Sequence, residues 1–139
     1  MESAARLKRT ESKRVLIVDD IKGIRERLRE FLEEAEFVAC GEAVNGQAAI
    51  ERATELRPDL IILDASMPVM TGIQAAPRLR KLLPGTIIIL FTAHEFMMQG
   101  INLRDLGVDA VVNKDHGMAA LGECLTSWQD GKILNTKPL

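Results

Sequence analysis

The chain has 139 residues, of which 47% are hydrophobic and 27% are charged, and its formal net charge is −2. These values are typical of one globular domain of ordinary size and do not fit a disordered or fibrous chain. The small negative charge argues against a nucleic-acid surface over the whole chain, although the first fourteen residues are locally basic. We therefore expect no direct nucleic-acid binding.

The apolar runs are too short to cross a membrane. The longest are Leu60–Leu63 and Ile87–Phe91, whereas a spanning helix needs roughly 20 residues. The N-terminus is charged where a secretory signal would be apolar. We expect a cytoplasmic protein without membrane contact. Cys40 and Cys124 lie far apart without CxxC spacing, so both are predicted to be buried free thiols.

Strand-like apolar runs alternate with amphipathic stretches from residue 15 onward. A strand at Val15–Asp19 is followed by a helix over Ile24–Ala35, in which apolar residues recur at helical spacing. A second strand at Val38–Val44 precedes a shorter helix, Ala48–Leu56. This helix stops before Pro58, because the residue preceding a proline disfavours the helical region.

The third strand is predicted at Leu60–Asp64, a short apolar run that ends in a carboxylate. Such a run, bounded by turn formers, is typical of a strand covered on both faces. A third helix is expected from Gly72 to Leu83. Pro77 lies within it and removes one backbone donor, which bends a helix unless the proline falls in the first turn.

The fourth strand is predicted at Ile87–Thr92 and the fifth at Ala110–Asn113. Between them, Glu95–Leu103 is the weakest predicted helix, because Gly100 costs about 1 kcal/mol relative to alanine. We expect this helix to be short or mobile.

The last helix carries one apolar stripe and stops near Gly131; the stripe consists of Leu121, Cys124, Leu125 and Trp128. We divide the chain into a charged tail at 1–13, one domain at 14–130, and a C-terminal tail or linker start at 131–139. Five strands alternating with five helices predict an α/β fold with a doubly wound, five-stranded parallel sheet.

Polar side chains stand at the carboxyl ends of the predicted strands. Asp19 and Asp20 end the first strand, and Asp64 ends the third. Thr92 ends the fourth strand and Lys114 follows the fifth. Open parallel sheets bind ligands at these ends, and in a sheet of order 2-1-3-4-5 the four ends are neighbours. The sequence thus indicates a candidate site.

Three carboxylates that converge in a small cleft repel one another unless a cation is bound. Magnesium prefers oxygen ligands and typically uses one or two carboxylates together with phosphate oxygens. We expect Asp20 and Asp64 to bind Mg²⁺ directly, Asp19 to act mainly through water, and a backbone carbonyl near Ser66 to supply another ligand.

With Mg²⁺ in place, Asp64 becomes a credible nucleophile toward a phosphoryl group. Lys114 can supply a positive charge and Thr92 a hydroxyl donor to the same group. Each residue alone also has a purely structural explanation. Asp20 could cap the following helix, and Asp64 could cap its helix or satisfy a turn. Thr92 could be an ordinary cap or strand residue, and Lys114 could be an exposed lysine after a strand. Their shared position at strand ends favours function.

The segments that contain these residues resemble receiver domains of two-component response regulators. The matching segments are Val15–Asp20, Asp64–Gly72, Phe91–Ala93 and Asn113–Lys114, and the resemblance spans Arg14–Asp130. It implies a flavodoxin-like sheet of order 2-1-3-4-5. It also implies Asp64 as phosphoacceptor, Asp19 and Asp20 as Mg²⁺ ligands, and Thr92 and Lys114 as phosphoryl contacts.

By this resemblance the chain is a signalling module and not an enzyme. Its partner would be a histidine kinase or a phosphotransfer protein. Phosphorylation would change the surface of the fourth helix, the fifth strand and the last helix, which could bind a downstream protein or a second copy. An apolar patch near the fourth helix could serve this contact or pack into the core; it comprises Phe96, Met97, Met98 and Ile101.

Several positions depart from the usual pattern of the family. Val111 stands where receivers often carry a switching aromatic residue, and Asp115 stands where many have proline. Lys114-Asp115 is similar to receivers of the LuxR/NarL type. His94 and Ser66 lie where the family tunes dephosphorylation, so we expect them to set the lifetime of the phosphorylated state. Alternatively, His94 is an exposed loop histidine at the start of a helix and has no such role, an explanation at least as well supported by the sequence.

Three other functions are alternatives to a phosphorylated receiver. A degenerate receiver could act as a phosphorylation-independent scaffold, an alternative that Val111 keeps open. A haloacid-dehalogenase-like phosphatase would need a second aspartate where this chain has Ser66. Flavodoxin-like cofactor binding is disfavoured, because Asp19-Asp20 would repel an anionic phosphate.

Overall fold

The computed structural model describes residues 12–93 and 99–130. Within these ranges, five strands form one fully parallel sheet in the order β2-β1-β3-β4-β5. The strands are β1 Arg14–Val18, β2 Val38–Ala43, β3 Leu60–Leu63, β4 Ile87–Thr92 and β5 Ala110–Asn113. The helices are α2 Lys22–Glu34, α3 Gly46–Leu56, α4 Gly72–Leu82, α5 Leu103–Leu106 and α6 Gly117–Gln129, with a 3-10 turn η2 at Lys114–His116.

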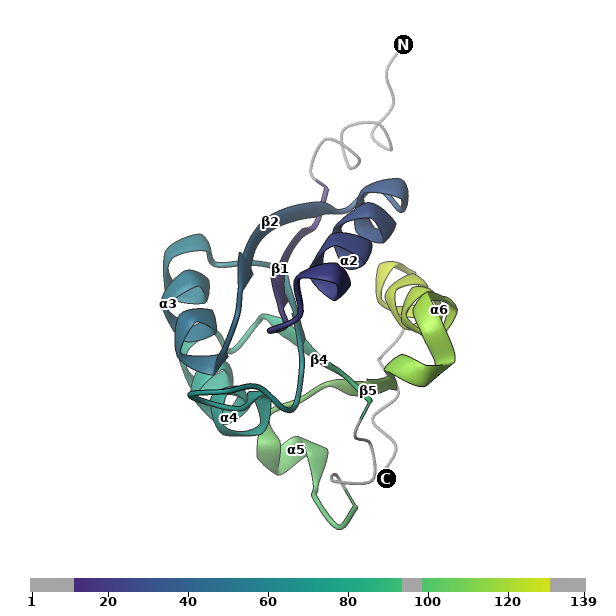
Figure 1. Cartoon of the computed structure of the whole chain (residues 1–139). Coiled ribbons are helices and arrows are strands. Elements are labelled where there is room, and N and C mark those ends of the chain that lie inside the picture. The colour runs from purple at the N-terminus through teal and green to yellow at the C-terminus, as the bar shows by residue number, and fades with distance from the viewer. Residues whose placement is uncertain (1–11, 94–98, 131–139) are drawn as a thin grey trace.

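Helices cover both faces of the sheet (Figure 1). Helices α2 and α6 pack on one face, and α3, α4 and α5 pack on the other. Alternate strand residues supply the two cores: Ile17 and Ile62 face α2 and α6, whereas Leu16 and Ile61 face the opposite layer. Burial on both sides explains why the central strands are continuous apolar runs. The predicted fold class and strand order are confirmed.

Local sequence signals explain where two helices begin. Asn45 caps α3 by accepting a hydrogen bond from the Ala48 N–H at 2.8 Å. Thr71 and Gln74 form a reciprocal capping box at the start of α4. Pro77 lies well beyond the first turn of α4, yet the helix continues to Leu82 and the proline is exposed.

Residues 95–98 of the predicted fourth helix, Glu95–Leu103, lie outside the described ranges. The described part is not helical before Leu103: Gly100 is in a turn with a positive φ of 79°, and α5 begins at Leu103. Asn102 caps α5, and Gly107 ends it in the left-handed conformation. Helix α5 is therefore one turn that starts where the predicted helix was expected to end.

Burial of the cysteines is less complete than predicted. Cys40 and Cys124 are free and only partly buried, and burial raises the pKa of the Cys124 thiol to about 11. Among the described residues, no helix is long and apolar enough to cross a membrane. The domain boundary at residue 14 coincides with the start of β1, and the tails at 1–13 and 131–139 stay a prediction.

Candidate functional site

Two buried carboxylates end adjacent strands of the sheet. Asp19 directly follows β1 and is 1% exposed, and Asp64 directly follows β3 and is 5% exposed. Neither acts as a helix cap: α2 is capped at Ile21 without a side-chain bond, and α4 is capped by Thr71. A capping role is therefore wrong for Asp64, and also for Asp20, which is exposed beside Asp19. Asp64 does take part in a turn, because its Oδ1 accepts a hydrogen bond from the Ser66 N–H.

Lys114 bridges the two buried carboxylates. Its Nζ lies 2.6 Å from Asp19 Oδ2 and 3.3 Å from Asp64 Oδ2. The same ammonium lies 5.9 Å from the centre of the Phe91 ring, within reach of a cation–π contact. The Lys114 side chain is only 13% exposed, so it is not an ordinary surface lysine.

Burial sets the acidity of Asp64. Desolvation raises the pKa of its carboxyl above the usual value; Lys114 opposes this shift and the Asp19 charge adds to it. The Ser66 N–H also favours the ionised form by donating to Asp64 Oδ1 at 3.3 Å. A nearby cation would therefore stabilise the ionised form of Asp64.

The acidic residues lie close enough to share a metal ion. One carboxylate oxygen from each of Asp19, Asp20 and Asp64 lies within 4.8 Å of the others. Three carboxylates against the single charge of Lys114 leave an excess of negative charge, which a hard divalent ion can offset. Oxygen-only donors with one exposed member suit Mg²⁺, which keeps several of its waters. The donor set therefore fits the predicted ion.

The structure describes some of the other predicted residues, and the rest lie outside the described ranges. Thr92 is fully buried at the end of β4, paired in register with Asn113 of β5. Val111 is half-buried and packs against the core layer that contains α5. His94 lies outside the described residues, as do Phe96, Met97 and Met98 of the expected apolar patch. Ile101, its last member, is half-buried and packs against the core.

Two residues at the site were not predicted. Gly72 begins α4 so close to the Asp64 backbone that an added Cβ would lie 1.9 Å from the Asp64 carbonyl O. Arg25 of α2 donates from Nη1 to the Asp19 carbonyl O at 2.8 Å. The motif Asp64–Gly72 contained a signal for the glycine, because close backbone approach requires a residue without Cβ.

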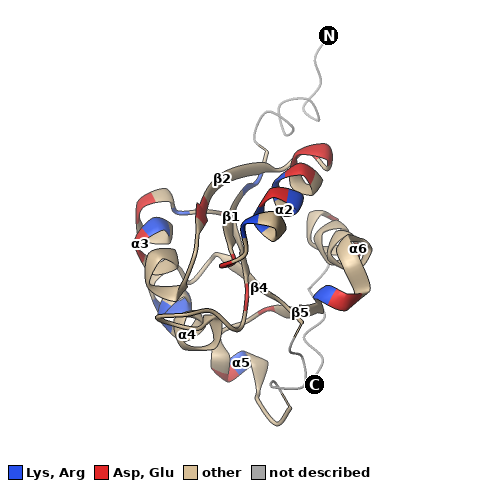
Figure 2. Ribbon diagram, viewed as in Figure 1, with Lys and Arg blue, Asp and Glu red and all other residues tan. Residues whose placement is uncertain are grey.

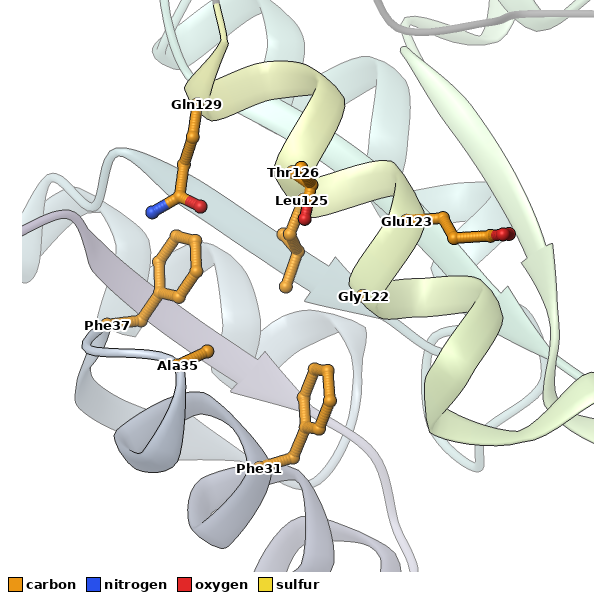
Figure 3. Close-up of a pocket in the computed structure, with 8 residues that line it drawn as sticks. All are labelled: Phe31, Ala35, Phe37, Gly122, Glu123, Leu125, Thr126 and Gln129. Atoms are coloured by element: carbon orange, nitrogen blue, oxygen red, sulfur yellow. The ribbon is translucent and has the colours of Figure 1, made fainter.

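A separate concavity of about 500 Å³ lies between α2 and α6 (Figure 3). Phe31, Phe37 and Leu125 give it a mainly apolar lining. None of the lining residues is a predicted site residue, so this groove is distinct from the acidic site. The predicted site residues therefore lie at the strand ends and not in this groove.

Comparisons with known proteins agree with this geometry. The family model of the response regulator receiver domain matches residues 15–126. The transcriptional regulatory protein YdfI of Bacillus subtilis is 36% identical over 124 aligned residues, covering 87% of this chain and 57% of YdfI. The chain thus corresponds to little more than half of YdfI.

Solved structures show the same architecture. Response regulator TrrA of Thermotoga maritima, in complex with Mg²⁺-BeF, is 34% identical with a TM-score of 0.73, over 83% of this chain and 97% of TrrA. The signal receiver domain of NarL from Mycobacterium tuberculosis is 28% identical with a TM-score of 0.75, over 87% and 98%. The predicted likeness to LuxR/NarL-type receivers is confirmed. Given the match over residues 15–126, this chain belongs to the response regulator receiver domain family.

Proposed function

We propose that this receiver domain is phosphorylated on Asp64 and holds Mg²⁺ for that reaction through Asp19, Asp20, Asp64 and the Ser66 backbone carbonyl. The observation that carries the proposal is the convergence of the three carboxylates within 4.8 Å, bridged in part by Lys114. The related TrrA was solved with Mg²⁺-BeF, which supports the choice of ion.

The phosphoryl group comes from a phosphohistidine of a histidine kinase or a phosphotransfer protein. An Asp64 carboxylate oxygen bonds to phosphorus while the phosphorus–nitrogen bond of the donor breaks and its electrons return to the imidazole. Bound Mg²⁺ supplies charge neutralisation for the phosphoryl oxygens. Asp64 reacts as the carboxylate, so the cations that oppose its raised pKa also keep the nucleophile ionised.

Lys114 and Thr92 contact the phosphoryl group once it is attached. In this structure Lys114 Nζ is closest to Asp19 Oδ2, at 2.6 Å, and only a short displacement carries it to new oxygens on Asp64. Phosphorylation adds about two negative charges and three acceptor oxygens. The resulting movement alters the surface made by the α5 region, β5 and α6, through which a downstream protein or a second copy binds.

Ser66 and His94 set how long the phosphorylated state lasts, because their family positions lie near the path of the attacking water. Val111 replaces the usual aromatic switch, so the signal passes through Thr92 and the α5 region. We place the protein in the cytoplasm, where such kinases act. It is a signalling module whose only reactions are its own phosphorylation and dephosphorylation.

The test is intact mass measurement after incubation with acetyl phosphate, with and without Mg²⁺. We expect one phosphoryl adduct that requires Mg²⁺, is absent from Asp64→Asn and is retained by Asp130→Asn, which changes an exposed aspartate at the end of α6. An unlabelled parent, under conditions that label another receiver, would favour the phosphorylation-independent scaffold. Continuous release of phosphate from phosphomonoesters would favour the phosphatase.

A further inference from the structure

A series of polar contacts ties the Asp19 backbone to α2 and β2. Arg25 of α2 donates from Nη1 to the Asp19 carbonyl O at 2.8 Å and from Nε to Glu42 Oε1 at 2.9 Å. The second Glu42 oxygen accepts from Arg29 Nη2 at 2.7 Å. Figure 2 shows an acidic segment on β2 and basic segments on the neighbouring α2. The Arg25 side chain is 14% exposed, so water has limited access to it.

The carbonyl that Arg25 holds belongs to the peptide joining Asp19 to Asp20. On the other side of Asp19, its N–H donates to the Ala43 carbonyl at 3.1 Å. The Ile21 N–H donates to Asp19 Oδ1 at 2.9 Å. A peptide is planar, so fixing its oxygen also fixes the direction in which the chain continues. Arg25 thereby sets the direction in which Asp20 leaves β1.

This orientation matters most for Asp20. Asp19 and Asp64 are buried, and packing restrains them. Asp20 is exposed, so its carboxylate gains little restraint from neighbouring side chains, although it must lie within 4.8 Å of the other two to share an ion. The position of the Asp20 carboxylate therefore depends mainly on the conformation of its own backbone.

We propose that Arg25 is a positioning residue for Mg²⁺ binding by Asp19, Asp20 and Asp64, and that Glu42 orients its guanidinium. The inference rests on the proposed function, in which these three residues hold Mg²⁺. The role requires an arginine: its planar fork donates to two acceptors at once, whereas lysine offers a point charge on a flexible stem. Because Arg25 donates to the Asp19 carbonyl O and to Glu42, and not to a carboxylate of the acidic site, it acts through the backbone of the acidic residues.

If Arg25 acted only through its charge, removing it would strengthen Mg²⁺ binding, the opposite of what positioning predicts. The reason is that a cation near the acidic residues repels Mg²⁺. Arg25→Lys keeps the charge and removes the fork, which isolates positioning from charge. Arg29→Lys is the matched control, because Arg29 pairs with the same Glu42 and donates to the Ala39 carbonyl, not to Asp19.

The experiment measures urea unfolding of the parent, Arg25→Lys and Arg29→Lys at increasing MgCl₂, with ionic strength held constant by KCl. The value without Mg²⁺ reports the structural contribution of each arginine, and the Mg²⁺-dependent increase gives the Kd. We expect similar losses of stability without Mg²⁺. We expect Arg25→Lys to bind Mg²⁺ about tenfold more weakly, the size typical of losing an indirect partner of a metal site. Arg29→Lys should stay within about twofold of the parent.

A second series at high salt tests charge directly, because screening shortens the reach of exposed charges to about 3 Å at 1 M. A deficit that persists supports positioning, and one that disappears overturns it. Equal Kd values for the parent and Arg25→Lys, or equal losses in both variants, would also overturn it. Should Arg25→Lys not fold, Glu42→Gln is expected to weaken binding in the same direction. A parent that Mg²⁺ does not stabilise would instead overturn the proposed metal site, and this inference with it.

Discussion

Lys114 Nζ lies 2.6 Å from Asp19 Oδ2 and 3.3 Å from Asp64 Oδ2, so the ammonium is closer to Asp19 than to the proposed phosphoacceptor. This places a positive charge against the same oxygens that would bind Mg²⁺. The lysine and a bound ion would therefore compete for part of the negative charge of the site. Binding of the ion would weaken the hold of Asp19 on Lys114 and leave the lysine available to a phosphoryl group.

Replacing Lys114 by methionine should separate these two effects. Without Mg²⁺, the change leaves Asp19 and Asp64 buried without their cation, and the free energy of unfolding should fall by about 3 kcal/mol. Mg²⁺ should then stabilise the variant more than it stabilises the parent. Urea unfolding at several MgCl₂ concentrations measures both quantities. Lys81→Met, at an exposed position of α4, should change stability by less than about 0.5 kcal/mol.

Replacing Gly72 by alanine should disturb the proposed phosphoacceptor through the backbone. The added Cβ would lie 1.9 Å from the Asp64 carbonyl O and 2.8 Å from its carbonyl carbon. Neither atom belongs to a flexible side chain, so the backbone must shift. We expect a loss of about 2–3 kcal/mol in the free energy of unfolding, together with slower labelling by acetyl phosphate. Denaturant melts and intact mass provide the two measurements.

Gly23→Ala supplies the matched control. Gly23 is in α2, and a Cβ built there meets nothing within 4 Å. Alanine should therefore stabilise the helix by about 0.5–1 kcal/mol and leave labelling unchanged. If Gly72→Ala were equally well tolerated, the close packing of α4 on the Asp64 backbone would not constrain the site.

The sequence predicted the sheet closely because four of its strands are short apolar runs that end at polar residues. Asp64, for example, stands directly after a fully buried β3. The contact between Arg25 and the Asp19 carbonyl has no such signal, since it depends on where a long side chain folds back over a loop. The extent of α5 was not predicted, although Asn102 and Gly107 are ordinary start and stop signals. The prediction followed the apolar residues before Gly100 and did not use this capping pattern.

Val69 is strained in this structure. It has a positive φ of 69° and is 82% exposed, so the left-handed backbone strains this β-branched residue and burial does not offset the strain. The strain destabilises the folded state by about 1–2 kcal/mol. Glycine removes the strain, but part of this gain is lost because glycine makes the unfolded chain more flexible. Val69→Gly should raise the free energy of unfolding by about 0.5–1 kcal/mol.

The comparison for Val69 is Val44→Gly. Val44 is also exposed, at 46%, but is not among the described residues with positive φ. Glycine there relieves no strain and should lower stability. Thermal and urea unfolding of both variants measure the difference. A loss of stability in Val69→Gly as large as that in Val44→Gly would show that the loop tolerates valine without strain.

The contribution of Glu42 to stability should depend on pH. Burial raises the pKa of its carboxyl, but the hydrogen bonds and charges of Arg29 and Arg25 outweigh burial and hold the pKa below its usual value. A carboxyl with a lowered pKa binds fewer protons in the folded state than in the unfolded state. Its stabilisation is complete above the unfolded pKa, about 4.3, and is lost as the pH falls through the folded pKa.

Glu42→Gln should therefore lower the free energy of unfolding by about 1 kcal/mol at pH 7, and its difference from the parent should shrink as the pH falls below about 4.3. Urea unfolding between neutral and acidic pH measures this difference. Glu55→Gln is the control, because Glu55 pairs with Arg52 on the exposed side of α3; its effect should stay below about 0.5 kcal/mol. A Glu42→Gln deficit that does not change with pH would mean that packing of the side chain, and not its charge, joins β2 to α2.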